Sequence, residues 1–141
     1  TWNRFEKITQ DLDANFQGAL LVAQQKAGPE FIVGAMRDEE FAPVAMVGPG
    51  GILVEILKSP TFFLAPVDPD HVLSVVSEGI VGTIMKGVRG GSPLDQDFLA
   101  KIVADVSWLI YAFPEIKEID LNPIVGYPFG GAILDARIML L

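Results

Sequence analysis

The chain has 141 residues, half of them apolar, and a formal net charge of −8. This length suits one domain or a large piece of one. The acidic balance argues against a nucleic-acid partner, because Lys and Arg must neutralise the phosphates there. Cysteine is absent, which excludes disulfides and thiolate metal sites.

Membrane and secretory segments are not expected either. The longest uncharged stretch near the middle, residues 41–54, is shorter than a bilayer requires. The first residues carry both charge signs and lack the apolar core of a secretory signal. We therefore expect a cytoplasmic protein without a membrane partner. Its high mean hydropathy reflects either a large core or an apolar surface that a further segment covers.

The first half of the chain predicts a short helix followed by strands. Apolar periodicity places the helix at residues 2–13 and a buried strand at residues 19–24. Charged or glycine-rich turns then separate further strands. The expected pairs are residues 30–37 with 42–47 and residues 52–58 with 61–65.

The second half predicts helices and a final hairpin. Asp68 and Pro69 are typical of a helix start, and Val72, Val75, Val76 and Ile80 form its expected buried stripe. A longer helix follows Ser92, and its core face repeats every fourth residue, at Leu94, Phe98, Ile102, Val106 and Ile110. Two strands, residues 116–127 and 132–140, close the chain. The sum is an α+β fold, an antiparallel sheet flanked by helices.

The last hairpin carries the most specific chemical pattern. With a turn centred between Pro128 and Phe129, paired residue numbers sum to 257. Asn122 then lies opposite Asp135, and Asp120 opposite Arg137, all on one face together with Ile124 and Ile133. Carboxylate and amide oxygens suit a hard cation such as Mg²⁺. The alternatives are an ordinary Asp120–Arg137 ion pair and an Asn122 that merely satisfies a turn.

The residues of this hairpin resemble the closing segment of ATP-grasp domains in acyl-CoA synthetases. The resemblance rests on Glu-Ile-Asp-Leu-Asn-Pro-Ile at 118–124 and Ala-Ile-Leu-Asp-Ala-Arg at 132–137, which look like succinyl-CoA synthetase beta subunits. It implies that Asn122 and Asp135 bind the Mg²⁺ of ATP or ADP, with Asp120 beside them.

A second block, residues 30–55, resembles the glycine-rich pattern of the ADP-forming acetyl-CoA synthetases. The resemblance implies that Arg37 and Glu55 line the nucleotide cleft, although a plain salt bridge between them is the alternative. Backbone N–H groups of Gly50 and Gly51 would approach phosphate oxygens, unless these residues only connect two strands. Phe63 stands where many relatives have Arg.

The resemblance covers the whole chain and identifies it as the carboxy-terminal subdomain of an ATP-grasp domain. It implies partners in cis or as a separate subunit, namely the amino-terminal ATP-grasp subdomain and the CoA-binding and ligase domains. The isolated chain would then be inactive. The intact enzyme would convert acyl-CoA, ADP and phosphate to acid, CoA and ATP. The alternative is a nucleotide-sensing or structural module without turnover, for example within an acyltransferase fusion, which Phe63 would favour.

Overall fold

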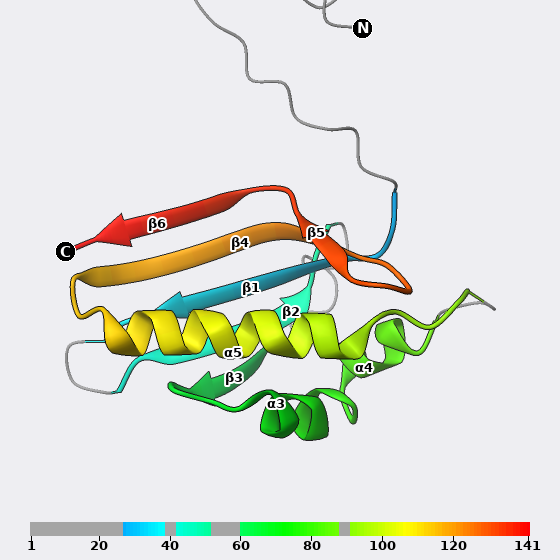
Figure 1. The fold of residues 1–141 in the computed structure, drawn as a ribbon, viewed down its shortest axis with the longest axis horizontal. Helices are drawn as coiled ribbons and strands as arrows, with labels where there is room; N and C mark the ends of the chain where they lie inside the picture. Colours follow the sequence, from blue (N-terminus) through cyan, green and yellow to red (C-terminus); the bar gives the residue numbers. More distant parts are fainter. Residues whose placement is uncertain (1–26, 39–41, 52–59, 88–90) are drawn as a thin grey trace, which may run out of the picture.

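A computed structural model describes residues 27–38, 42–51, 60–87 and 91–141. Within these residues the chain forms two layers, an antiparallel sheet of six strands and three helices that cover one of its faces (Figure 1). The predicted fold class is therefore confirmed. The helix expected at residues 2–13 and the strands expected at 19–24 and 52–58 lie outside the described residues.

All pairings in the sheet are antiparallel. After β3 the chain passes through the helices and returns to the sheet as β4, which pairs with β1. The strand order is β3-β2-β1-β4-β5, and β6 also pairs with β4, so β5 and β6 follow one another along the same edge. Both hairpins expected among these strands are confirmed. The strands are β1 (Glu30–Met36), β2 (Val44–Pro49), β3 (Thr61–Leu64), β4 (Ile116–Gly126), β5 (Gly131–Ile133) and β6 (Ala136–Leu140).

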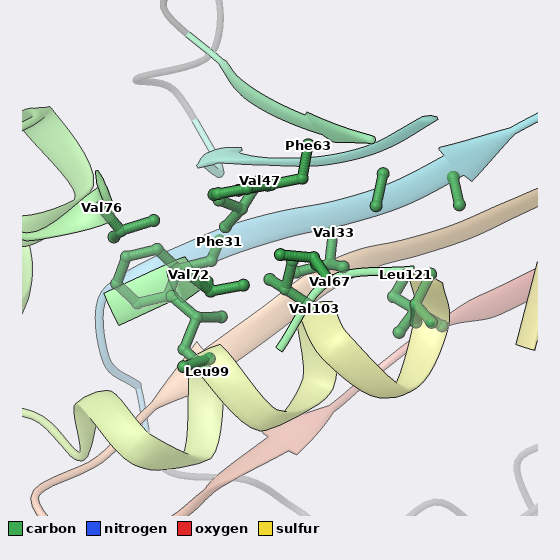
Figure 2. Packing of buried hydrophobic residues seen from close by; sticks show 14 of the residues in the cluster. Phe31, Val33, Val47, Phe63, Val67, Val72, Val76, Leu99, Val103 and Leu121 are labelled. Carbon is green, nitrogen blue, oxygen red and sulfur yellow. The ribbon is translucent and has the colours of Figure 1, made fainter. Parts of the chain in front are cut away.

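Alternation along the central strand β1 assigns the two faces of the sheet. Phe31 and Val33 are fully buried against the helices, and Ala35 continues that row. Met36, on the other face, is exposed over 57% of its surface. Successive side chains of a strand point to opposite faces, so the sheet has a covered face and an open face. In Figure 2 the labelled side chains of β1, β2 and α5 meet on the covered side.

The helical layer begins with two short helices instead of one. α3 (Pro69–Val76) ends early, and α4 (Ile80–Met85) starts after a turn at Ser77–Gly79. A Cβ at Gly82 would lie 2.5 Å from the carbonyl oxygen of Val76, so the two helices meet where only glycine fits. Val75 lies beside the buried row that Val72 and Val76 form in α3 and is 38% exposed, so its predicted burial is wrong.

The long helix α5 (Gln96–Ala112) crosses the sheet and contacts β1, β2 and β4. Its predicted core face is only partly correct. A repeat of four residues drifts about 40° per step around a helix with 3.6 residues per turn. The deepest row consists of Leu99, Val103, Val106 and Ile110, while Phe98 and Ile102 lie at its margin. No helix of the described residues is long and apolar enough to cross a membrane.

Candidate nucleotide and metal site

The open face of the sheet is hollowed into a shallow trough of about 300 Å³. Gly34 lies on its floor, directly opposite Asp120 in the pairing of β1 with β4. Because Gly34 has no side chain, the space beside the Asp120 carboxylate stays open. The walls combine apolar side chains of β1 to β3 with the carboxylates of β4, namely Met36, Val44, Met46, Phe62, Glu118 and Asp120.

The register expected for the last hairpin is confirmed. Asp120 pairs with Arg137, and the backbone N–H of Asn122 donates to the carbonyl oxygen of Asp135 at 3.1 Å. Asn122 and Asp135 are therefore opposed across β4 and the turn between β5 and β6. Opposed residues of an antiparallel pair share a face. Asn122 and Asp135 are exposed, and Asp120 is partly exposed.

One detail of that prediction is wrong, because Ile124 does not share this face. The pairing of β1 with β4 shifts between Phe31 and Val33, which face Ile124 and Leu121 respectively. Asn122 and Pro123 therefore stand opposite a single residue, and this bulge reverses the alternation. Ile124 turns into the core with 0% exposure.

Three residues of the site carry oxygen donors that have no partners among the described residues. No hydrogen bond or ion pair joins the side chains of Asp120, Asn122 or Asp135 to any other described residue. The expected alternative, an Asp120–Arg137 ion pair, does not form. The Arg137 guanidinium instead donates to Glu118 Oε1 at 2.8 Å, one diagonal step along the strands.

These donors fit Mg²⁺ in kind and number. Mg²⁺ prefers oxygen and is held by one or two carboxylates together with water and phosphate oxygens. Among the described residues, no three His, Cys, Asp or Glu side chains are grouped as a metal cage. Asn122 and Asp135, with Asp120 beside them, therefore suit a cation that arrives with a nucleotide better than a permanently enclosed structural metal.

Arg37 lies on the other side of the sheet from these donors. Its guanidinium donates to backbone carbonyls at the end of α5 and just beyond it. Nη2 reaches the oxygens of Ile110 and Phe113, the latter at 3.3 Å, and Nε reaches Ile116 at 3.2 Å. A cation suits the carbonyl-rich end of a helix. The structure therefore gives Arg37 a structural partner set and does not bring it to the metal donors.

The two predicted phosphate-binding glycines lie at the opposite end of β1 from Arg37. The N–H of Gly50 donates to the carbonyl oxygen of Glu30 at 2.6 Å, and a Cβ on Gly50 would lie 2.8 Å from backbone atoms of Glu30 and Phe31. Gly50 is thus required by close backbone contact, and its N–H is already engaged. Gly51 has a φ of 59°, which favours glycine. Glu55 lies outside the described residues.

Phe63 also belongs to the covered face. It pairs with Ala45, is 5% exposed, and forms an edge-to-face contact with the His71 ring at a centroid distance of 6.2 Å. Position 63 is thus part of the packing between β3 and the helices. Phe63 therefore does not face the trough.

The sequence reasoning missed the contribution of Met46, Phe62 and Glu118 to this face. Strand alternation could have found them, because Met46 pairs with Gly34 and Phe62 pairs with Met46. Glu118 lies two residues before Asp120, on the same face.

An antiparallel sheet with helices on one face and accessible oxygen donors on the other defines an α+β domain with an open polar face. The profile of the ATP-grasp domain matches residues 2–140. The chain belongs to the ATP-grasp domain family.

Two of its relatives are an ADP-forming CoA ligase and a subunit of another. The chain is 41% identical over 128 residues to the beta subunit of acetate–CoA ligase [ADP-forming] I of Pyrococcus furiosus. This match covers 91% of the chain and 55% of that subunit. It is 40% identical over 129 residues to the 4-hydroxybutyrate–CoA ligase [ADP-forming] of Nitrosopumilus maritimus, covering 90% of the chain and 18% of the ligase. The chain thus spans about half of the subunit and a smaller part of the longer ligase.

Solved structures with a similar fold support this family assignment. The dinucleotide-forming acetyl-coenzyme A synthetase 1 of Ca. Korarchaeum cryptofilum, in complex with coenzyme A and Mg-AMPPCP, superposes with a TM-score of 0.76 at 34% identity. The match covers 83% of the chain and 55% of that protein. A Pyrococcus horikoshii protein superposes with a TM-score of 0.79 at 32% identity, covering 99% of the chain and 61% of that protein.

Proposed function

We propose that the chain is the nucleotide- and Mg²⁺-binding carboxy-terminal part of the ATP-grasp domain of an ADP-forming acyl-CoA synthetase. In the complete protein, the reaction would convert acyl-CoA, ADP and phosphate to acid, CoA and ATP. The observation that carries this proposal is the opposition of Asn122 and Asp135, whose backbones are joined at 3.1 Å. Both side chains are exposed, and their oxygens have no partner among the described residues.

Each side chain has a distinct task in this proposal. Asp135 and Asn122 hold the cation from two sides of the hairpin, and Asp120 adds negative charge next to them. Mg²⁺ bound there supplies positive charge to the phosphate oxygens during phosphoryl transfer. The trough reaches this edge of the sheet at Asp120, with Gly34 on its floor, and would give the nucleotide access to it.

The isolated chain is expected to lack turnover. An ATP-grasp site holds its nucleotide between two subdomains, and the chain spans only about half of its beta-subunit relative. The proposed site lies on an open face, so half of the nucleotide would remain in contact with solvent. The amino-terminal subdomain and the CoA-binding and ligase domains would complete the enzyme, in cis or as a separate subunit.

A nucleotide-sensing module without turnover remains the alternative. Phe63 no longer favours it, since this side chain packs against the helices and not in the trough. The alternative shares the same nucleotide and metal residues, so binding cannot separate the two functions. Formation of ATP from acyl-CoA, ADP and phosphate by the complete protein does separate them.

The test replaces Asp135 by Asn in the full-length protein and measures both Mn²⁺·ATP binding, by water-proton relaxation, and ATP formation. We expect binding to weaken at least about tenfold, since a carboxylate ligand is lost, and ATP formation to be abolished. Asp105→Asn is the matched control, because it removes one exposed carboxylate from the helical layer. Full activity of the Asp135→Asn variant would refute the metal assignment. Retained binding in the wild type without any ATP formation would favour sensing.

A further inference from the structure

Arg137 is a cation at the edge of the proposed metal site. It lies in β6 opposite Asp120, and its guanidinium is joined to Glu118 at 2.8 Å. Asp135 precedes it by two residues, just before β6 begins, so in an extended chain the two residues lie roughly 7 Å apart. An extended Arg side chain can cross that separation.

The other described cations are not available to this site. Arg37 is bound to carbonyls at the end of α5, Lys86 donates to the carbonyl of Ser77, and Lys101 is paired with Asp105 on the outer side of α5. Lys117 lies at a bulge near the start of β4, where the pairing with β6 shifts, and is five residues from Asn122 in the sequence. Of the cations in the part of the chain that the structure describes, Arg137 is the one paired directly with a residue of the proposed site, Asp120.

The balance of charge at the site suggests that Arg137 offsets the negative charge of a bound nucleotide. Glu118, Asp120 and Asp135 make this edge of the sheet anionic, and a nucleoside di- or triphosphate brings several more negative charges. A divalent cation offsets only part of them. The planar guanidinium forms paired hydrogen bonds with phosphate oxygens more readily than any other side chain.

The ion pair with Glu118 is suited to exchange. The side chain of Arg137 is 61% exposed and that of Glu118 is 38% exposed. Ion pairs in contact with water contribute little to stability, so the guanidinium can leave Glu118 at small cost. Before the nucleotide arrives, the pair keeps Arg137 on the open face and away from Asp120.

We propose that Arg137 moves from Glu118 to the phosphate oxygens of the metal-bound nucleotide. Glu118 is then a positioning residue that holds the guanidinium beside the site until phosphate replaces its carboxylate. This inference rests on the proposed function, because it requires a nucleotide at Asn122 and Asp135.

The test compares two affinities in the full-length protein, one for ATP in the presence of Mg²⁺ and one for Mn²⁺ alone. Arg137→Gln should weaken ATP binding about tenfold, as expected for a lost charge-assisted contact. The same change should leave Mn²⁺ affinity unchanged or higher, because a positive charge beside the carboxylates has been removed. Glu118→Gln should lower the Mn²⁺ affinity, because a negative charge beside the site has been removed. It should leave the ATP affinity at least as high as in the wild type.

Lys101→Gln is the matched control, since it removes one Lys from an exposed ion pair on the far side of α5. Unchanged ATP affinity in Arg137→Gln would overturn the inference while the proposed function stands. A parallel loss of ATP and Mn²⁺ affinity would also overturn it, because this indicates a disrupted hairpin. If Asp135→Asn binds ATP and Mn²⁺ as the wild type does, the proposed function fails, and this inference fails with it.

Discussion

Asp95 joins the start of α5 to the hairpin that carries the proposed site. One carboxylate oxygen accepts the N–H of Phe98 at 3.0 Å, as an N-cap residue does, and the other accepts the N–H of Gly130 at 2.8 Å. The N–H of Asp95 itself donates to Tyr127 at 2.8 Å. Replacing Asp95 by Ala should therefore both weaken the helix start and release the turn between β4 and β5.

The expected loss follows from these two contacts. An N-cap side chain replaced by Ala costs about 1 kcal/mol. The contact with Gly130 adds about 1 kcal/mol, at the lower end for a charged acceptor because the side chain is partly exposed. The sum of about 2 kcal/mol corresponds to a fall in Tm of roughly 6 °C for a domain of this size.

The same contacts predict a pH dependence with a defined sign. The hydrogen bond from Gly130, followed by that from Phe98, lowers the pKa of Asp95, against a smaller opposing effect of burial. A lowered pKa in the folded state means that the ionised carboxylate stabilises the fold. This stabilisation is complete above the ordinary Asp pKa of about 3.9 and is lost as pH falls through the lowered folded value.

The assay is urea unfolding of the wild type, Asp95→Ala and Asp95→Asn at several pH values between 7 and 3. Asn is also a good N-cap residue, so Asp95→Asn keeps the cap on Phe98 while it removes the charge and the acceptor of the Gly130 N–H. This change should cost about 1 kcal/mol at pH 7. That difference should shrink at the acid end. Asp97→Asn, an exposed residue of the first helical turn, is the control. A pH-independent difference between the wild type and Asp95→Asn would refute the reasoning.

Three further variants probe the covered side of the sheet. Ser107→Ala should lose about 1 to 3 kcal/mol, because it leaves the N–H of Val67 buried without the acceptor that now lies at 3.0 Å. Gly131→Ala should lose about 1 to 3 kcal/mol by overpacking, since its Cβ would meet the Phe98 ring and lie 2.6 Å from the carbonyl oxygen of Val125. Arg37→Met should lose about 2 kcal/mol with the carbonyl contacts of its guanidinium. Urea unfolding measures all three.

Each of these variants has a matched control elsewhere in the chain. Ser74→Ala removes an exposed hydroxyl, Gly48→Ala places a Cβ in ordinary contact with Pro60 at 3.6 Å, and Lys101→Met removes an exposed cation. We expect each control to change stability by less than about 0.5 kcal/mol. A variant that is no less stable than its control would contradict the packing argument for that position.

The sequence predicted the last hairpin well because several local signals agree there. The turn residues 128–131 set the centre, and the flanking apolar residues leave one register that buries Ile119 and Leu121. A fixed register then determines that Asn122 opposes Asp135. What the pattern did not contain was the bulge at Asn122 and Pro123, because a bulge depends on the partner strand β1.

The roles of residues whose contacts lie far away in the sequence were harder to predict. Arg37 resembles a cleft residue in sequence, yet its partners are 73 to 79 residues away at the end of α5. Gly50 resembles a phosphate-binding glycine, although its close contact with Glu30 already explains the lack of a side chain. A local pattern identifies the residue type that a position needs, but the tertiary contact decides the reason.

The two faces of the sheet divide the polar groups into two kinds, and this division is the strongest argument for the location of function. On the covered side the polar groups are used up by the fold, as with Arg37 on helix-end carbonyls and Ser107 on Val67. On the open side Asp120 and Asp135 remain without partners among the described residues, next to an ion pair that water already weakens. Carboxylates on an open face without cationic partners among the described residues are what the proposed Mg²⁺ site requires, and this is why we place the proposed function on that face.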